Sequence, residues 1–230
     1  MPPGVIHQIA YIAIVAVPII IAITFHEAAH GFVAKLFGDD TATRLGRVTF
    51  NPLKHIDPFG TIILPALLLL LHAGFVFGYA KPVPVNFRAL RNPKRDMIWV
   101  AAAGPGTNIG LALASAGLLY FALQAGAATS GGMVTLLVAS LEINLVLAVL
   151  NLLPLPPLDG GRVMTGLLPH GLSEPYARIE PYGMVIIIAA LFLLPYIGSK
   201  LGIDLDVFGW LVARPVAWLM RGILTVVAQL

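Results

Sequence analysis

The sequence contains no cysteine and little charge. Without cysteine the chain can form neither a disulfide nor a cysteine-ligated metal site, and its redox compartment stays open. Charged residues make up 11% of its 230 residues, whereas soluble domains carry about 25%. Hydrophobic residues make up 58%, and the mean hydropathy is +0.90. This composition excludes an ordinary soluble domain and indicates an integral membrane protein.

Internal repeats, polar low-complexity stretches and clusters of basic with aromatic residues are also lacking. The first two absences predict one continuous domain over residues 1–230. The third argues against a nucleic-acid partner, so basic cytoplasmic loops explain the formal net charge of +3 more simply. No Lys or Arg precedes the first apolar block, which we therefore expect to be a membrane helix and not a removable signal peptide.

Apolar blocks long enough to cross a bilayer, which takes about 20 residues, recur along the chain. They lie at 5–37, 97–123, 131–153, 182–198 and 207–228, and a borderline block lies at 61–79. Pro65 and Gly74 interrupt that borderline block. The sequence therefore predicts an all-α fold, a polytopic membrane bundle of five to six transmembrane helices.

The borderline block at 61–79 is flanked by basic connections that hold nine of the fourteen Lys and Arg residues. If the block crossed the membrane, these two connections would face opposite sides, against the usual bias of basic residues toward the cytoplasm. A re-entrant loop with a short extended segment, placed between the first helix and residue 97, keeps both on one side. Non-helical backbone is tolerated at membrane depth where protein or water surrounds it. We favour the re-entrant loop, and an ordinary sixth span is the alternative.

A polar cluster, HEAAH at 26–30, interrupts the first apolar block. A charged side chain at the bilayer centre costs about 2.5 kcal/mol or more, so we expect these residues to be functional. His26 and His30 are four residues apart and share one face of a helix, where both can bind one metal ion. Glu27 can then take a proton from water activated by the metal, as in zinc hydrolases. The alternative is a pair of interior histidines hydrogen-bonded to other helices.

A third metal ligand is needed, and Asp159 is the best candidate. It lies in NLLPLPPLDGGRV at 151–163, where prolines stop the preceding helix and two glycines permit a tight turn. In the re-entrant topology this turn and the two histidines reach the same, cytoplasmic end of the membrane. Two imidazoles and a carboxylate with one open position suit a single Zn²⁺ ion. A helix N-cap is the alternative role for Asp159.

Five stretches occur in the order found in a known family. They are HEAAH at 26–30, NPLKHIDPFGT at 51–61, FGYAKPVPVN at 77–86, AAGPGTN at 102–108 and NLLPLPPLDGGR at 151–162. Together they resemble the site-2 protease family of intramembrane zinc metalloproteases, over about residues 20–165. We expect a compact type, without the PDZ domain and the additional first span that many members carry. The last two apolar blocks carry no family signature.

The resemblance implies roles for residues of this site. His26, His30 and Asp159 match the zinc ligands, and Glu27 matches the catalytic glutamate. Asn151 matches an asparagine at the catalytic centre, where its amide could donate to a developing oxyanion. Hydrogen bonding between helices is the alternative role for Asn151.

Other family stretches have less certain roles. The resemblance implies that 77–86 lines substrate access and captures an unwound substrate by strand addition. We expect His55 to be a loop residue, with a metal-neighbouring donor as the alternative. Asn108 and Asn144 are expected to join helices, and Gly104 and Gly106 to let helix backbones approach closely. Glu142 is either a proton-sharing neighbour of the site or a side chain facing the outer surface.

The resemblance implies an intramembrane zinc metalloendopeptidase that cleaves transmembrane segments in regulated intramembrane proteolysis. Its domain would divide into a catalytic core at about 5–165 and C-terminal helices at 180–230. We expect single-span membrane proteins as substrates, the lipid bilayer as surroundings, and recognition by the membrane core or a separate adaptor protein. The expected location is a prokaryotic inner membrane, with the active site toward the cytoplasm.

A membrane metal-ion or proton transporter is the alternative function. It would also place His, Glu and Asp side chains at membrane depth. A transporter predicts paired inverted half-repeats, however, and the sequence shows none.

Overall fold

The computed structural model describes residues 3–63, 66–67, 70, 78–126 and 131–229. Its α-helices are α1 (Pro3–Leu36), α2 (Thr41–Arg44), α4 (Pro93–Gln124), α5 (Gly131–Asn151), α6 (Asp159–Leu167), α7 (His170–Ala177), α8 (Glu180–Ile188), α9 (Leu194–Leu201) and α10 (Arg214–Gln229). Short 3-10 turns are η1 (Pro52–Lys54) and η3 (Phe87–Ala89), and π-helical turns are η2 (Pro58–Ile63), η5 (Ala189–Leu193) and η6 (Gly209–Ala213). These described ranges contain no strand, so the predicted all-α fold class is confirmed.

Five helical segments within the described ranges are long and apolar enough to cross a membrane. They are Ala13–Leu36, Pro93–Gln124, Gly131–Asn151, Glu180–Leu201 and Gly209–Gln229. The fourth is made of α8, η5 and α9, and the fifth of η6 and α10. Each corresponds to an apolar block of the sequence, so the polytopic bundle is confirmed.

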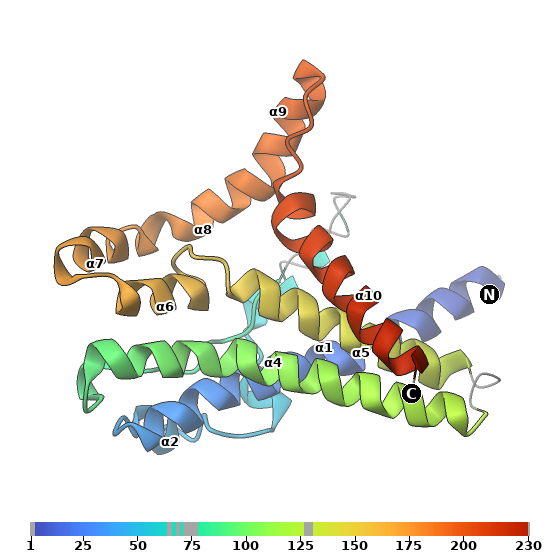
Figure 1. Ribbon diagram of the computed structural model, residues 1–230, viewed down its shortest axis with the longest axis horizontal. Helices are drawn as coiled ribbons and strands as arrows, with labels where there is room; N and C mark the ends of the chain where they lie inside the picture. Colours follow the sequence, from blue (N-terminus) through green and yellow to red (C-terminus); the bar gives the residue numbers. More distant parts are fainter. Residues whose placement is uncertain (1–2, 64–65, 68–69, 71–77, 127–130, 230) are drawn as a thin grey trace.

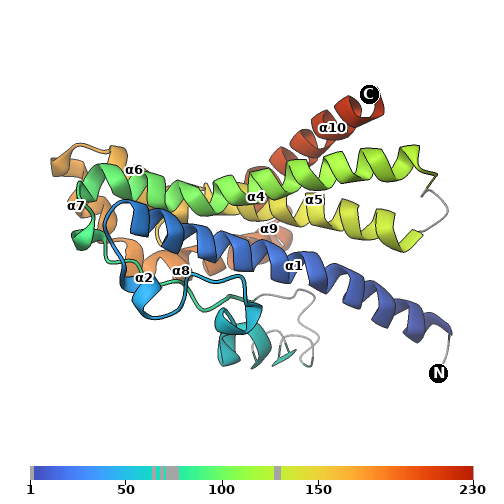
Figure 2. The ribbon, with the colours of Figure 1, turned by 90° about the horizontal axis from the view of Figure 1, so that it is seen from below.

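Helices α1, α4 and α5 lie side by side and form the core of the molecule (Figures 1 and 2). α4 is the central element, with extensive contacts to α5, α1 and α6. Small residues of α4, Ala112 and Ala116, pack against Leu141 and Leu145 of α5. Small side chains let membrane helices approach closely, and they place α4 near the functional residues of both neighbours.

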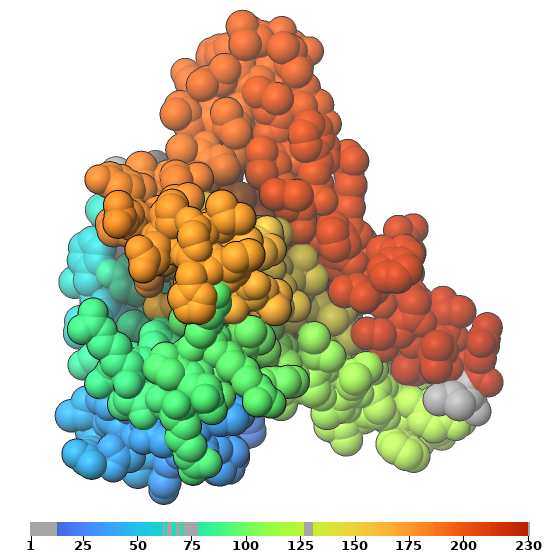
Figure 3. Space-filling view, turned by 60° about the vertical axis from the view of Figure 1, so that its left-hand side comes forward, coloured from blue at the N-terminus to red at the C-terminus, as the bar shows by residue number. Residues whose placement is uncertain are grey.

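The C-terminal helices form a second region that leans away from this core. α8, η5 and α9 run outward from the end of the bundle where α6 and α7 lie, and α10 returns across α5 (Figure 1). In the space-filling view the orange and red helices rise above the green and blue core (Figure 3). Val212 of η6 and Val216 of α10 join the cluster formed by α4 and α5, and further apolar residues along α10 pack against it. This region is therefore attached to the core mainly through η6 and α10.

The two ends of the borderline block at 61–79 are hydrogen-bonded to each other. The Tyr79 N–H donates to the Gly60 carbonyl at 3.0 Å, and the Thr61 hydroxyl donates to the Tyr79 carbonyl at 2.9 Å. The ends of a membrane span would lie about 30 Å apart. The chain therefore returns to the point where it left, as the re-entrant interpretation requires. Residues 64–65, 68–69 and 71–77 of this block lie outside the described residues.

The proline-rich turn after α5 has the predicted structure. α5 ends at Asn151 and α6 begins at Asp159, so the prolines between them separate two helices. A Cβ at Gly160 or Gly161 would meet the backbone of Leu152 or Pro156, so both positions need glycine for close approach. The N-cap of α6 is Leu158, and no side chain caps its first turn. The alternative role of Asp159 as an N-cap is therefore not the one seen.

Candidate metal centre

Three of the predicted site residues meet at one point between α1 and the start of α6. The Nε2 atoms of His26 and His30 lie 3.1 Å apart, and they lie 3.2 and 3.3 Å from Oδ2 of Asp159. The three residues are 7%, 8% and 6% exposed, so the cluster is shielded from lipid. The helix places the two histidines on one face, and the proline-rich turn brings the aspartate to them.

The other ring nitrogen of each histidine is occupied by an acceptor. Nδ1 of His26 lies 2.6 Å from the amide oxygen of Asn108, and Nδ1 of His30 lies 2.7 Å from the carbonyl of Val100. Each Nδ1 must therefore carry the proton and donate it. In the neutral rings both Nε2 atoms then present lone pairs toward each other and toward a carboxylate oxygen. Such a cluster of acceptors needs a cation to hold it together.

The spacing of this cluster fits one zinc ion. Zinc binds imidazole nitrogen and carboxylate oxygen at about 2.0–2.2 Å in tetrahedral geometry, which places neighbouring ligand atoms about 3.3 Å apart. The three observed separations agree with that value. Two neutral imidazoles and one carboxylate also leave a fourth position open, as in catalytic zinc sites.

The electrostatics favour an ionised third ligand. Burial alone would raise the pKa of the Asp159 carboxyl, but a positive charge on the imidazoles within 3.3 Å lowers this pKa well below its usual range, and a bound cation would take the place of that charge. The carboxylate therefore offers a negative charge to a cation across the physiological pH range.

Glu27 follows His26 on α1 and is held by the extended segment at 78–86. Its Oε2 accepts the backbone N–H of Val83 at 2.7 Å. A backbone donor cannot titrate, so it fixes the carboxylate without competing for a proton. Glu27 is half-buried, in contrast to the buried histidines on either side of it. A carboxylate that is anchored and still reachable by water suits a general base.

Gly104 of α4 is a site residue whose position the sequence analysis attributed to helix packing alone. A Cβ added to it would lie 2.5 Å from Nε2 of His30 and 2.6 Å from Nε2 of His26. The backbone of α4 therefore forms one wall of the metal centre, and only glycine fits there. Its signal in the sequence is the spacing to Asn108, four residues later on the same face of the helix.

A buried chain of polar side chains leads away from His26 into the bundle. The Asn108 amide, fully buried, donates to the side-chain oxygen of Asn144 at 2.9 Å. Asn144 donates to the Ser140 carbonyl at 2.8 Å, and the hydroxyls of Ser140 and Ser115 lie 2.8 Å apart. Asn108 and Asn144 thus join helices as expected, and Asn108 also fixes the orientation of a histidine.

Among the described residues, Asn151 and His55 form their hydrogen bonds with groups other than the three-residue cluster. The Asn151 amide donates to the Leu147 carbonyl of its own helix at 2.9 Å, so its oxyanion role stays a prediction. Nε2 of His55 lies 3.0 Å from the Thr49 carbonyl, as befits the loop residue we favoured. Glu142 is exposed on the surface of α5.

The extended segment at 78–86 offers few backbone donors for strand addition. The N–H groups of Tyr79, Lys81 and Val83 donate to Gly60, His55 and Glu27 respectively. Pro82 and Pro84 have no N–H group. The carbonyls of Tyr79, Lys81 and Pro82 also accept hydrogen bonds, from Thr61 and Arg47, so a substrate would find few free backbone groups here for an extended ladder.

The chain matches known proteins over most of its length. The profile of peptidase family M50 matches residues 14–126 and 120–194. A Bacillus subtilis protein provisionally named zinc metalloprotease YwhC is 42% identical over 183 residues, covering 78% of this chain and 80% of that protein. No solved structure gives a significant match.

Two mycobacterial proteins, both provisionally named zinc metalloprotease Rip2, are more distant. The one from Mycolicibacterium smegmatis is 31% identical over 174 residues, covering 75% of this chain and 64% of that protein. The one from Mycobacterium tuberculosis is 30% identical over 181 residues, covering 76% and 65%. The chain thus spans a little under two thirds of the mycobacterial proteins. The family profile and these identities agree with the resemblance carried by the five sequence stretches, and the chain belongs to peptidase family M50, the site-2 protease family.

Proposed function

We propose that, in this intramembrane zinc metalloprotease, His26, His30 and Asp159 hold the one Zn²⁺ ion and Glu27 is the general base. The observation that carries this proposal is the convergence of three lone-pair-bearing atoms within 3.3 Å of one another. The family supports both the protease activity and the metal.

The residues around the site have distinct tasks in this proposal. When bound, zinc supplies a Lewis acid that polarises a carbonyl group and acidifies water. Glu27, held by the Val83 N–H, accepts a proton from the attacking water and passes it to the leaving amine. Asn108 keeps the proton of His26 on Nδ1, so that Nε2 is free for the metal. Asn151 is proposed to donate its second amide hydrogen to the developing oxyanion.

The substrates are membrane proteins within a lipid bilayer, and we propose that they are single-span proteins cut in regulated intramembrane proteolysis. A helix hides its peptide bonds, so the substrate must unwind locally before water reaches the scissile carbonyl. A separate adaptor protein is proposed to assist recognition.

We propose that the site faces the cytoplasm in a prokaryotic inner membrane. Eleven of the fourteen Lys and Arg residues lie within 35–95 and 162–178. These ranges join the core helices at the end where α1 and α5 finish and α4 begins. Basic residues favour the cytoplasmic side. The named relatives are bacterial proteins, which supports a prokaryotic origin.

The domain is proposed to be continuous over 1–230, with a catalytic core at about 5–165 and C-terminal helices at 180–230. The metal-binding residues all lie in the first part, and the family profile extends to residue 194. The alternative of a metal-ion or proton transporter gains no support from the family or the relatives.

The proposal is tested with a panel of single-span substrates in proteoliposomes. Glu27→Gln should abolish cleavage and retain zinc, because the amide cannot accept a proton. Glu174→Gln, an exposed position on α7, is the matched control and should cleave normally. His26→Ala should lose zinc as well as activity. Cleavage by Glu27→Gln at the normal rate would refute the assignment of the base.

A further inference from the structure

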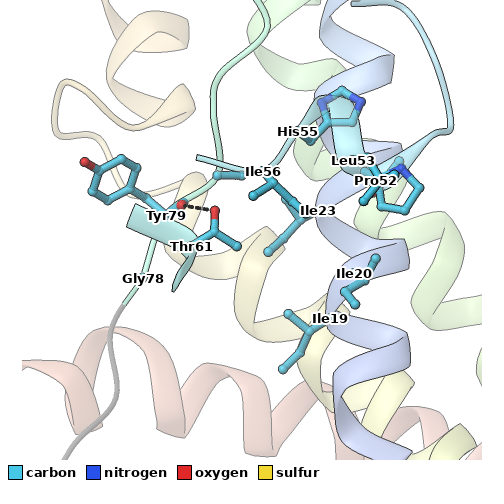
Figure 4. A pocket seen from close by; sticks show the side chains of 12 residues that line it. Ile19, Ile20, Ile23, Pro52, Leu53, His55, Ile56, Thr61, Gly78 and Tyr79 are labelled. Carbon is cyan, nitrogen blue, oxygen red and sulfur yellow. Dashed lines mark hydrogen bonds between the residues drawn. The ribbon is translucent and has the colours of Figure 1, made fainter. Parts of the chain in front are cut away.

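A second concave site lies beside Glu27 and has no part in metal binding. It is an apolar cavity of about 480 Å³ between α1 and the loop that follows α2. Ile20, Ile23 and Thr24 line it from α1, and Leu53, His55 and Ile56 line it from the loop. Figure 4 shows the isoleucines of α1 facing Ile56 and Thr61 across the space, with Tyr79 beyond them.

The cavity is adjacent to the proposed base because of helix geometry. Ile20, Thr24 and Glu27 are spaced by four and three residues, so they form one stripe along α1. The cavity therefore begins about one helical turn, or about 5 Å, from Glu27. The extended segment connects the two places, because Lys81 donates to the His55 carbonyl and Val83 donates to Glu27.

His55, which lines this apolar cavity, carries one buried polar atom without a hydrogen-bond partner among the described residues. Its Nε2 lies 3.0 Å from the Thr49 carbonyl and must donate to it, so in the neutral ring Nδ1 is an acceptor. His55 is 3% exposed, and among the described residues this buried Nδ1 has no hydrogen-bond partner. A buried acceptor without a donor is unfavourable, and such an atom commonly marks a place that a ligand completes.

We propose that this cavity is a substrate subsite that takes a branched aliphatic or aromatic side chain next to the scissile bond. In this subsite Nδ1 of His55 accepts a main-chain N–H of the unwound substrate. The inference rests on the proposed protease function and adds a side-chain preference to it. A lipid chain would fill the apolar volume but has no donor for the imidazole, whereas an unwound peptide supplies both groups.

The size of the subsite is tested with Ile20→Trp and substrates that carry Leu, Phe or Ala beside the cut. The larger side chain should lower kcat/KM for Leu and Phe substrates by about tenfold or more and leave the Ala substrate much less affected. Leu118→Trp, at an exposed position of α4, is the control and should preserve the original preference. Zinc content verifies that each variant is folded. An unchanged preference in Ile20→Trp would overturn the subsite and leave a lipid chain as its occupant.

Occupancy is tested by disulfide trapping, since the chain has no cysteine of its own. Ile20→Cys in the Glu27→Gln background should cross-link to substrate cysteines placed within a few residues of the cut and not to distant ones. Uniform cross-linking, or none, would overturn the proposal. Because this readout needs no cleavage, it can fail while Glu27→Gln still behaves as the protease proposal requires.

The role of His55 is tested separately. His55→Gln can keep a donor for the Thr49 carbonyl, and its amide oxygen then lies away from the position of Nδ1, so KM should rise about tenfold with kcat nearly unchanged. An unchanged KM would overturn this hydrogen bond.

Discussion

The core helices and the C-terminal helices differ in how tightly they are packed. In the apolar stretch of each of the three spans at Ala13–Leu36, Pro93–Gln124 and Gly131–Asn151, 28% of the residues are buried, whereas in each of the last two spans the share is 11%. All three proposed metal ligands, the proposed base and the polar chain from Asn108 belong to the better packed region or its proline-rich turn. The residues of the proposed site are therefore held in place by close packing of the core helices. The C-terminal helices present most of their surface to lipid.

The two regions meet at the turn that carries Asp159. A Cβ at Gly183 of α8 would collide with the Pro156 carbonyl, so α8 packs directly on the turn. The Tyr176 hydroxyl donates to the Pro154 carbonyl at 2.7 Å. The C-terminal region is therefore expected to influence the metal centre through the position of one ligand, and less strongly than the core does.

The largest effect is expected at Gly104, where α4 packs tightly against the two proposed histidine ligands. Gly104→Ala places a methyl group 2.5–2.6 Å from both Nε2 atoms, so it should displace the imidazoles and abolish zinc binding and cleavage. Gly106→Ala is the matched control, because nothing lies within 4 Å of its Cβ. Alanine is the better helix former by about 1 kcal/mol, so helix propensity cannot explain a loss. Zinc content measures the outcome. Equal zinc content in both variants would contradict the interpretation that the α4 backbone at Gly104 forms one wall of the metal centre.

A smaller loss is expected at Asn108, which contacts the proposed ligand His26 and is not itself a proposed ligand. Asn108→Ala removes the acceptor that fixes the tautomer of His26, and metal affinity should fall about 10- to 100-fold. Ser115→Ala, at the far end of the same polar chain, should change affinity little. Competition with a zinc chelator measures both variants. Equal losses of metal affinity would show that the polar side chains from Asn108 to Ser115 act through helix packing and not through the tautomer of His26.

A still smaller effect is expected where the C-terminal region meets the turn. Gly183→Ala should force α8 away from Pro156, lowering stability by about 1–3 kcal/mol and zinc affinity several-fold. Gly171→Ala on α7 is the control, with open space around its Cβ. Thermal unfolding in detergent, with and without chelator, separates the two effects. A loss of zinc binding as large as that of Gly104→Ala would show that the C-terminal region constrains the metal centre as strongly as the core does.

The smallest effect is expected at the ion pair between α6 and α8. Arg162 and Glu180 lie 3.2 Å apart with side chains 36% and 47% exposed, so the pair should contribute less than about 1 kcal/mol. Arg162→Ala should therefore unfold close to the temperature of the parent chain. Arg178→Ala, an exposed residue with the same charge, controls for net charge. Because Arg162 also lies over the Phe87 ring, at 5.3 Å from its centroid, a clear destabilisation at Arg162 alone would mean that this contact or the ion pair holds α6 more firmly than the exposure of the pair indicates.

Local patterns in the sequence predicted most of the architecture of the core. The apolar blocks gave the five spans, and the proline and glycine residues around Asp159 predicted the turn between α5 and α6. His26 and His30 share a face because of their spacing alone. Gly104 was attributed to packing, because nothing in its neighbourhood tells which side chain its missing Cβ would meet.

By itself, the sequence determined which segments enter the bilayer and which side chains can bind a cation, because these depend on hydrophobicity, helical period and ligand chemistry. The sequence already named Asp159 as the best candidate for the third ligand, but only the tertiary structure shows that it meets the histidines, that Val83 anchors Glu27, and that His55 lines an apolar cavity. Each of these contacts joins residues from different elements, and such contacts follow from how the helices pack. Packing depends on the summed shape of many side chains, and no short stretch of sequence contains that sum.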